Sequence, residues 1–187
     1  MRLLPMIAAV LMALPTLTPA APETYKLNPA QSVVAFTYTY QGTPNQGRMP
    51  VKAARMLLDL DNVPGSQVDV TLDARGAQAG FFFATQTMKG PSVLYTDRFP
   101  EISFRSTRIT GDLRGAVVQG DLTIRDVTRP VTLRAGLYRQ EGTALGDRSR
   151  LIVQLTGTVS RAAFGAGGFP GFVDDAIALN IIARIEK

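Results

Sequence analysis

The sequence predicts an all-β protein whose strands form a closed antiparallel barrel of about eight strands. Apolar and polar residues alternate along many segments; between Leu151 and Val159, for example, every second residue is apolar or small. A period of two residues is typical of strands that bury one face. Because little of the chain has a helical pattern, we expect the sheet to hide its apolar face by curling on itself. A barrel of about eight strands can enclose one small ligand, so we expect the function to lie in its interior.

Nine segments have the alternation of a strand, and turns rich in Gly, Asn, Asp and Pro separate them. The expected strands lie at residues 24–28, 32–41, 53–61, 66–75, 101–109, 115–124, 129–139, 150–161 and 174–186. Residues 42–47 are expected to be one of the turns. We expect the last strand to close the barrel against the first.

Two segments do not alternate. In residues 77–96, the apolar residues fit an irregular helix or two short helices, with Gly90 and Pro91 between them. A helix inserted between strands covers a sheet or a barrel mouth, so this segment is the expected lid. Residues 161–175 are rich in Gly and Phe and are expected to form a long, partly apolar loop before the last strand.

Residues 1–20 are expected to be a signal peptide, which leaves residues 21–187 as a single domain. Arg2 supplies a short positive region, residues 3–17 are mainly apolar, and small residues precede the expected cleavage after Ala20. Cleavage there predicts a periplasmic or secreted protein. A retained membrane anchor is the alternative, although the apolar run is short for a bilayer span of about 20 residues.

The composition argues against several functional classes. Cysteine and histidine are both absent, which removes the usual zinc and copper ligands, the thiol nucleophile and the commonest general base. We therefore expect no catalytic residue, no metal site and no cofactor, although a serine–lysine hydrolase that uses Lys89 stays open. The net charge is +5, or +4 once Arg2 is removed, and the basic residues are spread along the chain. This pattern does not favour binding to nucleic acid.

An outer-membrane barrel is a second all-β alternative, because it also combines a signal peptide with alternating strands. Such barrels carry aromatic girdles at both membrane interfaces and turn their apolar face outward. This chain has no tryptophan, and only 7% of its residues are aromatic. The composition therefore favours a barrel with its apolar face inside.

Four segments in order resemble motifs of the YceI family of exported, lipocalin-like proteins that bind polyisoprenoid lipids. Gln31 stands where the family usually has histidine, Asn28 where it has aspartate, and Asp126 where glycine is common. The four segments are residues 25–36, 98–107, 120–131 and 161–165. The resemblance runs from about Tyr25 to Lys187.

The resemblance implies an eight-stranded antiparallel lipocalin-like barrel with a short helical insertion and an apolar interior. It also implies a long apolar ligand, either a polyisoprenoid or an isoprenoid quinone. Because Gln31 replaces a histidine expected near the barrel mouth, no headgroup preference follows from the family. The protein could also make a transient contact with a membrane surface or a membrane protein. Its oligomeric state stays open, and a homodimer is one alternative.

Alternation assigns a set of apolar side chains to the barrel interior, where their burial of a hydrocarbon tail would provide the affinity. The residues expected to line the cavity are Phe36, Tyr38, Leu58, Val70, Leu72, Phe104, Leu122, Val131, Leu133, Val153, Leu155 and Ile181. Phe81, Phe82, Phe83 and Phe164 are expected to gate it, with burial of the three consecutive phenylalanines in an ordinary core as the alternative.

Two further alternatives depend on single features of the chain. Arg161 is expected either to contact a ligand headgroup or to pair, buried, with the carboxylate of Asp174 or Asp175. The leading function is a lipid carrier or store. The alternative is an envelope stress-protection or protein-interaction module whose barrel is filled by its own side chains.

Overall fold

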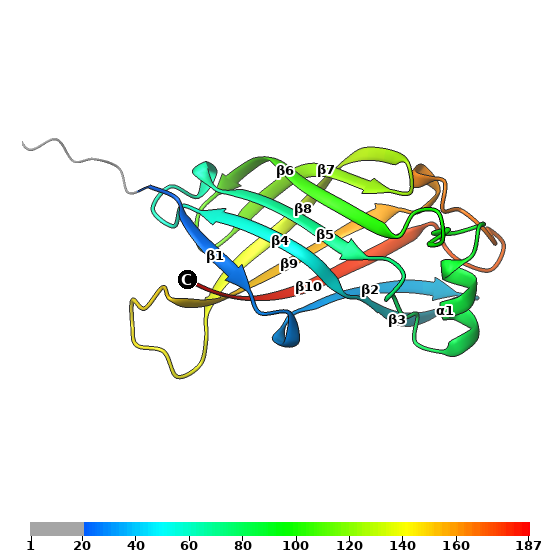
Figure 1. Ribbon diagram of the computed structural model, residues 1–187, viewed down its shortest axis with the longest axis horizontal. Helices are drawn as coiled ribbons and strands as arrows, with labels where there is room; N and C mark the ends of the chain where they lie inside the picture. The colour runs from blue at the N-terminus through cyan, green and yellow to red at the C-terminus, as the bar shows by residue number, and fades with distance from the viewer. Residues whose placement is uncertain (1–20) are drawn as a thin grey trace, which may run out of the picture.

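The computed structural model describes residues 21–187, which form a barrel of antiparallel strands with one short α-helix (Figure 1). The expected signal peptide lies outside the described residues. The strands are β1 (Glu23–Leu27), β2 (Val33–Tyr40), β3 (Thr43–Met49), β4 (Val51–Leu58), β5 (Gln67–Asp73), β6 (Glu101–Gly111), β7 (Ala116–Ile124), β8 (Val127–Arg139), β9 (Arg150–Ser160) and β10 (Ala176–Glu186). The helices are α1 (Phe82–Lys89) and the 3₁₀ turns η1 (Pro29–Gln31), η2 (Val63–Gly65) and η3 (Ala162–Phe164).

The ten strands occupy eight positions around a closed barrel. Strand β1 pairs with β4 on one side and with β10 on the other, which closes the ring. Strand β2 continues along β10 after the η1 interruption, and β4 follows β3 after Pro50. Proline lacks the N–H that a ladder needs, so a break at Pro50 is expected. The predicted closed eight-stranded antiparallel barrel is confirmed.

Alternation placed most strands within a few residues, but the prediction of a turn at residues 42–47 was wrong. The turn consists only of Gln41 and Gly42, which both have positive φ angles, of 48° and 77°. Two residues with positive φ form the tight turn whose twist suits a hairpin. Strand β3 therefore starts at Thr43 and pairs with β2 out to Met49.

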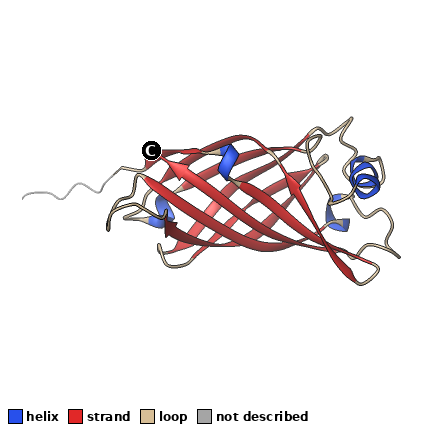
Figure 2. Cartoon of the chain, turned by 90° about the horizontal axis from the view of Figure 1, so that it is seen from below, coloured by secondary structure: helices blue, strands red, loops and turns tan. Residues whose placement is uncertain are grey.

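The insertion between β5 and β6 contains the one α-helix of the described residues. Helix α1 lies at one end of the barrel, outside the strands, as Figure 2 shows. The β2–β3 turn, the β7–β8 turn and residues 161–175 lie at the same end, which we call the α1 end. The opposite end, which we call the terminal end, carries η2, residues 140–149 and both ends of the described chain. There Lys187 forms an ion pair with Glu23.

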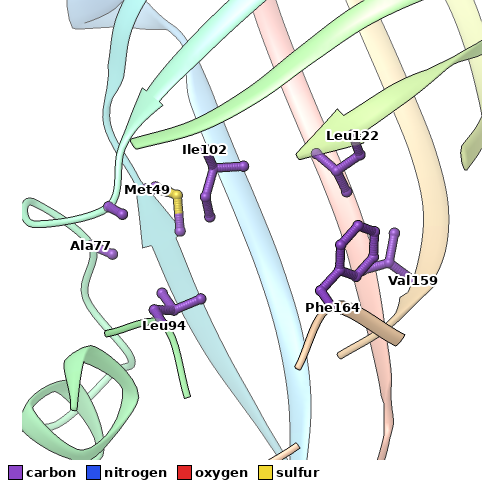
Figure 3. Close-up of a cluster of buried hydrophobic side chains, with 8 residues drawn as sticks. Met49, Ala77, Leu94, Ile102, Leu122, Val159 and Phe164 are labelled. Atoms are coloured by element: carbon purple, nitrogen blue, oxygen red, sulfur yellow. The ribbon is translucent and has the colours of Figure 1, made fainter. Parts of the chain in front are cut away.

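Buried apolar side chains gather in clusters near the two ends of the barrel. At the terminal end, Tyr25 and Ile185 are almost completely buried and pack with Met56 and Leu151. At the α1 end, Phe164 is the largest member of the buried cluster, and Figure 3 shows it beside Leu122 and Val159. The space between these clusters is the interior of the barrel.

Candidate functional site

A cavity of about 320 Å³ lies inside the barrel. Its lining extends from Val63 and Leu113 at the terminal end to Met88 and Val93 at the α1 end. All ten strands contribute to it, because the inward positions of each strand recur every second residue. On β8, for example, Val131, Leu133 and Ala135 line the cavity. The volume lies within the range of about 300–1,000 Å³ that is typical of small-molecule sites.

Eleven of the twelve residues that alternation assigned to the cavity lie on its wall. They are Phe36, Leu58, Val70, Leu72, Phe104, Leu122, Val131, Leu133, Val153, Leu155 and Ile181. Tyr38 is the exception, because its buried hydroxyl donates a 2.8 Å hydrogen bond to the carbonyl of Ala79 in the insertion. Burial also raises the pKa of Tyr38 above its ordinary value, since the phenolate would lose its hydration.

The four phenylalanines expected to form the gate lie in different environments. Phe81, Phe82 and Phe83 are exposed and lie outside the cavity wall, so neither the inward gate nor the ordinary core describes them. The cause is that α1 buries none of its residues and presents its N-terminal phenylalanines to solvent. Phe164, by contrast, is buried and helps to close the α1 end of the barrel.

Only four lining residues of the described chain have polar side chains, and main-chain groups engage each of them. The hydroxyl of Ser32 donates to the carbonyl of Asn28 and accepts from the amide of Arg184. The Ser66 hydroxyl accepts the amide of Asp59, and the Asp112 carboxylate accepts the amides of its own turn. The cavity thus presents a hydrocarbon surface with little free hydrogen-bonding capacity.

Arg161 is the fourth polar side chain, and it is only 7% exposed. Its guanidinium donates to four carbonyl oxygens, at distances of 2.6–2.9 Å. These oxygens belong to Ala166, Gly168, Val173 and Asp174. The expected alternative to a headgroup contact was a buried arginine paired with the carboxylate of Asp174 or Asp175. The burial is confirmed, but the partners are main-chain oxygens, because the loop turns these toward the arginine. The guanidinium therefore holds residues 161–175 in a compact fold at the cavity end.

Gln31 does not line the cavity. It lies in η1, which separates β1 from β2 along β10 on the flank of the barrel (Figure 1), and its side chain is exposed. The expectation of a position at the barrel mouth is therefore wrong for this chain. The neighbouring Ser32 reaches the cavity wall instead.

Two glycines that the sequence did not single out shape the cavity. A Cβ atom on Gly47 would lie 2.1 Å from the ring of Phe36, and one on Gly120 would lie 2.4 Å from the ring of Phe104. Each ring therefore lies across a glycine of a neighbouring strand. Sequence reasoning also missed Met49, because residues 42–47 were predicted as a turn and the next strand was expected to start only at residue 53. The alternation on β7 and β10 could have identified Val118 and Leu179, which also line the cavity. Ile109 lines it too, but only because the register of β6 shifts between Ser106 and Arg108, which alternation does not show.

Two other features are absent from residues 21–187. No cluster of three or more acidic, histidine or cysteine side chains there could hold a metal ion. Nor does any helix in that range have the length and apolar character needed to span a membrane.

The fold and the cavity define a class: a closed antiparallel barrel with an apolar internal site. A family model of the YceI-like domain matches residues 25–185. The chain therefore belongs to the YceI-like family, as its four motifs predicted.

Curated relatives support this assignment. The UPF0312 protein VPA0850 of Vibrio parahaemolyticus is 26% identical over 129 residues, which cover 68% of each chain. Protein YceI of Escherichia coli is 30% identical over 82 residues, which cover 44% of this chain and 43% of the relative.

Solved structures share the fold. BcnA of Burkholderia cenocepacia superposes with a TM-score of 0.75 at 17% identity, covering 85% of this chain and 99% of BcnA. A polyisoprenoid binding domain from Saccharophagus degradans, implicated in plant cell wall breakdown, superposes with a TM-score of 0.61 at 11% identity. That match covers 87% of this chain and 97% of the domain.

Proposed function

We propose that the protein is a non-catalytic carrier or store that holds a long apolar lipid inside its barrel. The observation that carries the proposal is the cavity itself, whose wall is almost wholly hydrocarbon and whose few polar side chains are engaged by the main chain. A ligand without hydrogen-bonding groups suits such a wall, because no buried polar group loses a partner when water leaves.

Isoprenoid chains are the class of ligand that we propose, as a polyisoprenoid or an isoprenoid quinone. The family resemblance supports this choice, as does the shared fold of the polyisoprenoid binding domain from Saccharophagus degradans. Burying on the order of 600 Å² of tail at roughly 25 cal/mol per Å² would contribute about 15 kcal/mol before ordering costs are subtracted. The apolar effect alone is thus large enough for stable binding.

The eleven predicted wall residues are the proposed contacts of the tail. Phe36 and Phe104 supply the largest apolar surfaces, while Phe164 closes the α1 end beyond the tail. The second candidate function, an interaction module with a filled barrel, requires an interior packed with side chains. The cavity favours the first candidate.

We further propose that the protein is exported, with residues 1–20 as its signal peptide and Ala21 as its mature N-terminus. The proposed location is the periplasm or the exterior of the cell. Intact-mass measurement of protein made in its native host tests this, and a mature chain that keeps residues 3–17 would contradict it.

Filling the cavity tests the function. Ala135 on β8 lines the cavity, and Ala135→Phe would place a ring in the space meant for lipid. Thr132 lies on the outer face of the same strand and is exposed, so Thr132→Phe is the matched control. We expect mass spectrometry of protein purified from its native envelope to find a stoichiometric apolar lipid in the wild type and in Thr132→Phe, and to find none in Ala135→Phe.

The proposal fails if the wild type carries no apolar lipid. It also fails if a correctly folded Ala135→Phe variant carries as much lipid as the wild type. Circular dichroism and thermal unfolding of both variants establish that the barrel has formed.

A further inference from the structure

Exposed aromatic side chains gather at the α1 end of the barrel. Phe82 and Phe83 are 70% and 77% exposed, and four other aromatic side chains on neighbouring turns are at least 40% exposed. We call this set the aromatic rim: Tyr40, Phe81, Phe82, Phe83, Phe169 and Phe172. It contains five of the nine phenylalanines of the chain. Exposed apolar groups concentrated in this way mark a contact surface.

Main-chain hydrogen bonds fasten the segments of the rim to one another. The carbonyl of Phe172 accepts the amide of Gln41, next to Tyr40, and the amide of Gly168 donates to Ser92 beyond α1. Phe169 has a φ angle of 60°, in the left-handed region that is costly for a residue with a side chain. The rim is therefore held in place by the fold, and its residues belong to separate segments that meet at the α1 end of the barrel (Figure 2).

The charges around the rim suit a lipid headgroup surface. Residues 76–96 contain one charged side chain, Lys89, and residues 162–173 contain none. Carboxylates flank these two segments at Asp73, Asp97, Asp174 and Asp175, and Asp126 lies in the neighbouring β7–β8 turn. Segments that carry apolar rings, one lysine and no acid of their own can enter the interface of a bilayer without repelling anionic lipids.

The inner side of the same segments reaches the lipid cavity. Met88, Val93 and Leu94 of the insertion line the cavity, as does Ala166 of the 161–175 loop. A tail that leaves the cavity at this end would therefore emerge beneath the rim. A bilayer placed against the rim would receive it without exposing it to water.

We propose that the aromatic rim docks on the surface of a lipid bilayer and that cargo is exchanged there. The rings come from separate segments and none of them lines the barrel cavity, so a deformable bilayer surface fits them better than the fixed relief of a protein. The inference rests on the proposed lipid-binding function and adds the partner surface and the end of the barrel that meets it.

Vesicle flotation tests the docking. The purified mature protein is mixed with vesicles of phosphatidylcholine, with and without phosphatidylglycerol, and the bound fraction is measured. The test variant is the double substitution Phe82→Ser and Phe83→Ser. The control is Leu145→Ser, which removes a 92% exposed side chain from the terminal end.

We expect the affinity of the double variant for vesicles to fall by about tenfold or more, since two rings no longer enter the interface. Leu145→Ser should bind as the wild type does, and Lys89→Gln should weaken binding only where phosphatidylglycerol is present. Absence of wild-type binding, or an equal loss in Leu145→Ser, would overturn the proposal.

Lipid content, measured in parallel by mass spectrometry, separates this inference from the proposed function. Docking by wild-type protein that carries no apolar lipid would support the rim as a membrane surface while refuting the carrier function. Lipid-loaded protein that does not dock would overturn the rim proposal and leave the carrier function intact.

Discussion

Single residues set the width of the cavity, and these residues include glycines as well as phenylalanines. The rings of Phe36 and Phe104 can lie along the barrel wall because Gly47 and Gly120 have no side chain beneath them. Cores tolerate little added volume, since their packing is dense. A methyl group at either glycine would push a ring toward the space proposed for the ligand.

Gly120→Ala is therefore expected to be destabilising and to reduce lipid uptake. The new Cβ would lie 2.4 Å from the Phe104 ring and 2.5 Å from the carbonyl oxygen of Arg105. Overpacking of this kind costs about 1–3 kcal/mol of unfolding free energy. Gly115→Ala is the control, because its Cβ would meet no atom within 4 Å. Urea unfolding gives the free energies, and equal stability of the two variants would contradict this account.

The sequence could predict which side chains point inward but not which of them meet. Alternation placed Phe104 and Leu133 on the cavity wall, because face assignment needs only the two-residue period. The glycines beneath the rings depend on the register between strands, which a single sequence does not show. Tyr38 has the correct parity, yet its hydroxyl reaches Ala79, a contact with a segment 41 residues away.

At the scale of elements, the loop of residues 161–175 depends on one side chain. It has little regular structure beyond η3, and its main-chain oxygens need donors. Arg161 supplies donors to four of them from a buried position. Because this loop closes the α1 end with Phe164, loss of the arginine would affect both stability and the cavity.

Arg161→Met keeps much of the apolar stem and removes the donors. We expect the unfolding free energy to fall by about 3 kcal/mol or more, since buried acceptors would lose hydrogen bonds to a charged group. Amide hydrogen exchange should quicken within residues 161–175 in particular. Arg129→Met is the control, since Arg129 is exposed and reaches one carbonyl at 3.5 Å. An effect of similar size in Arg129→Met would contradict the role assigned to Arg161.

Elements were predictable where the alternation of apolar and polar residues was either regular or clearly absent. The insertion and the long loop could be placed because residues 77–96 and 161–175 lack alternation. Strand β3 could not, since Pro44, Asn45 and Gly47 are residues typical of turns. It forms because β2 offers a paired partner and because β3 lies at the edge of the strand order, where proline is tolerated.

At the scale of the whole molecule, closure of the barrel replaces covalent cross-links. The chain contains no cysteine, so no disulfide restrains its unfolded state. Closure of the sheet leaves few unpaired strand edges. The seam where β1 meets β10 is secured by Ile185, which is fully buried and pairs with Leu27. The overall fold was predictable because a continuous apolar face on many strands has few other ways to be buried.

Global stability is expected to decline at high pH. Burial raises the pKa of both Tyr25 and Tyr38 above 10.0, the value of an exposed tyrosine. The contribution of these two tyrosines to the free energy of unfolding is complete below pH 10. It is lost as the pH rises through their higher folded-state pKa values, because the tyrosines of the unfolded chain ionise first. Denaturant unfolding between pH 8 and pH 11 should show a falling free energy of unfolding.

Substitutions identify the groups responsible for this decline. Tyr38→Phe and Tyr25→Phe should each flatten it, since the phenol that titrates is gone. Tyr138→Phe removes the hydroxyl of an exposed ring and is the matched variant. A slope that stays unchanged in both buried-site variants would assign the decline to other groups.

The ion pair with Glu23 holds Lys187 at the terminal end, and this position has a practical consequence for binding measurements. A tether attached after Lys187 would fix the molecule to a sensor chip by the end opposite Phe82 and Phe83, as the layout in Figure 1 shows. Immobilised molecules would then stand in a uniform orientation with their phenylalanines directed into the flow. Vesicles passed over such a chip would contact the α1 end first, and no fusion partner would cover that end.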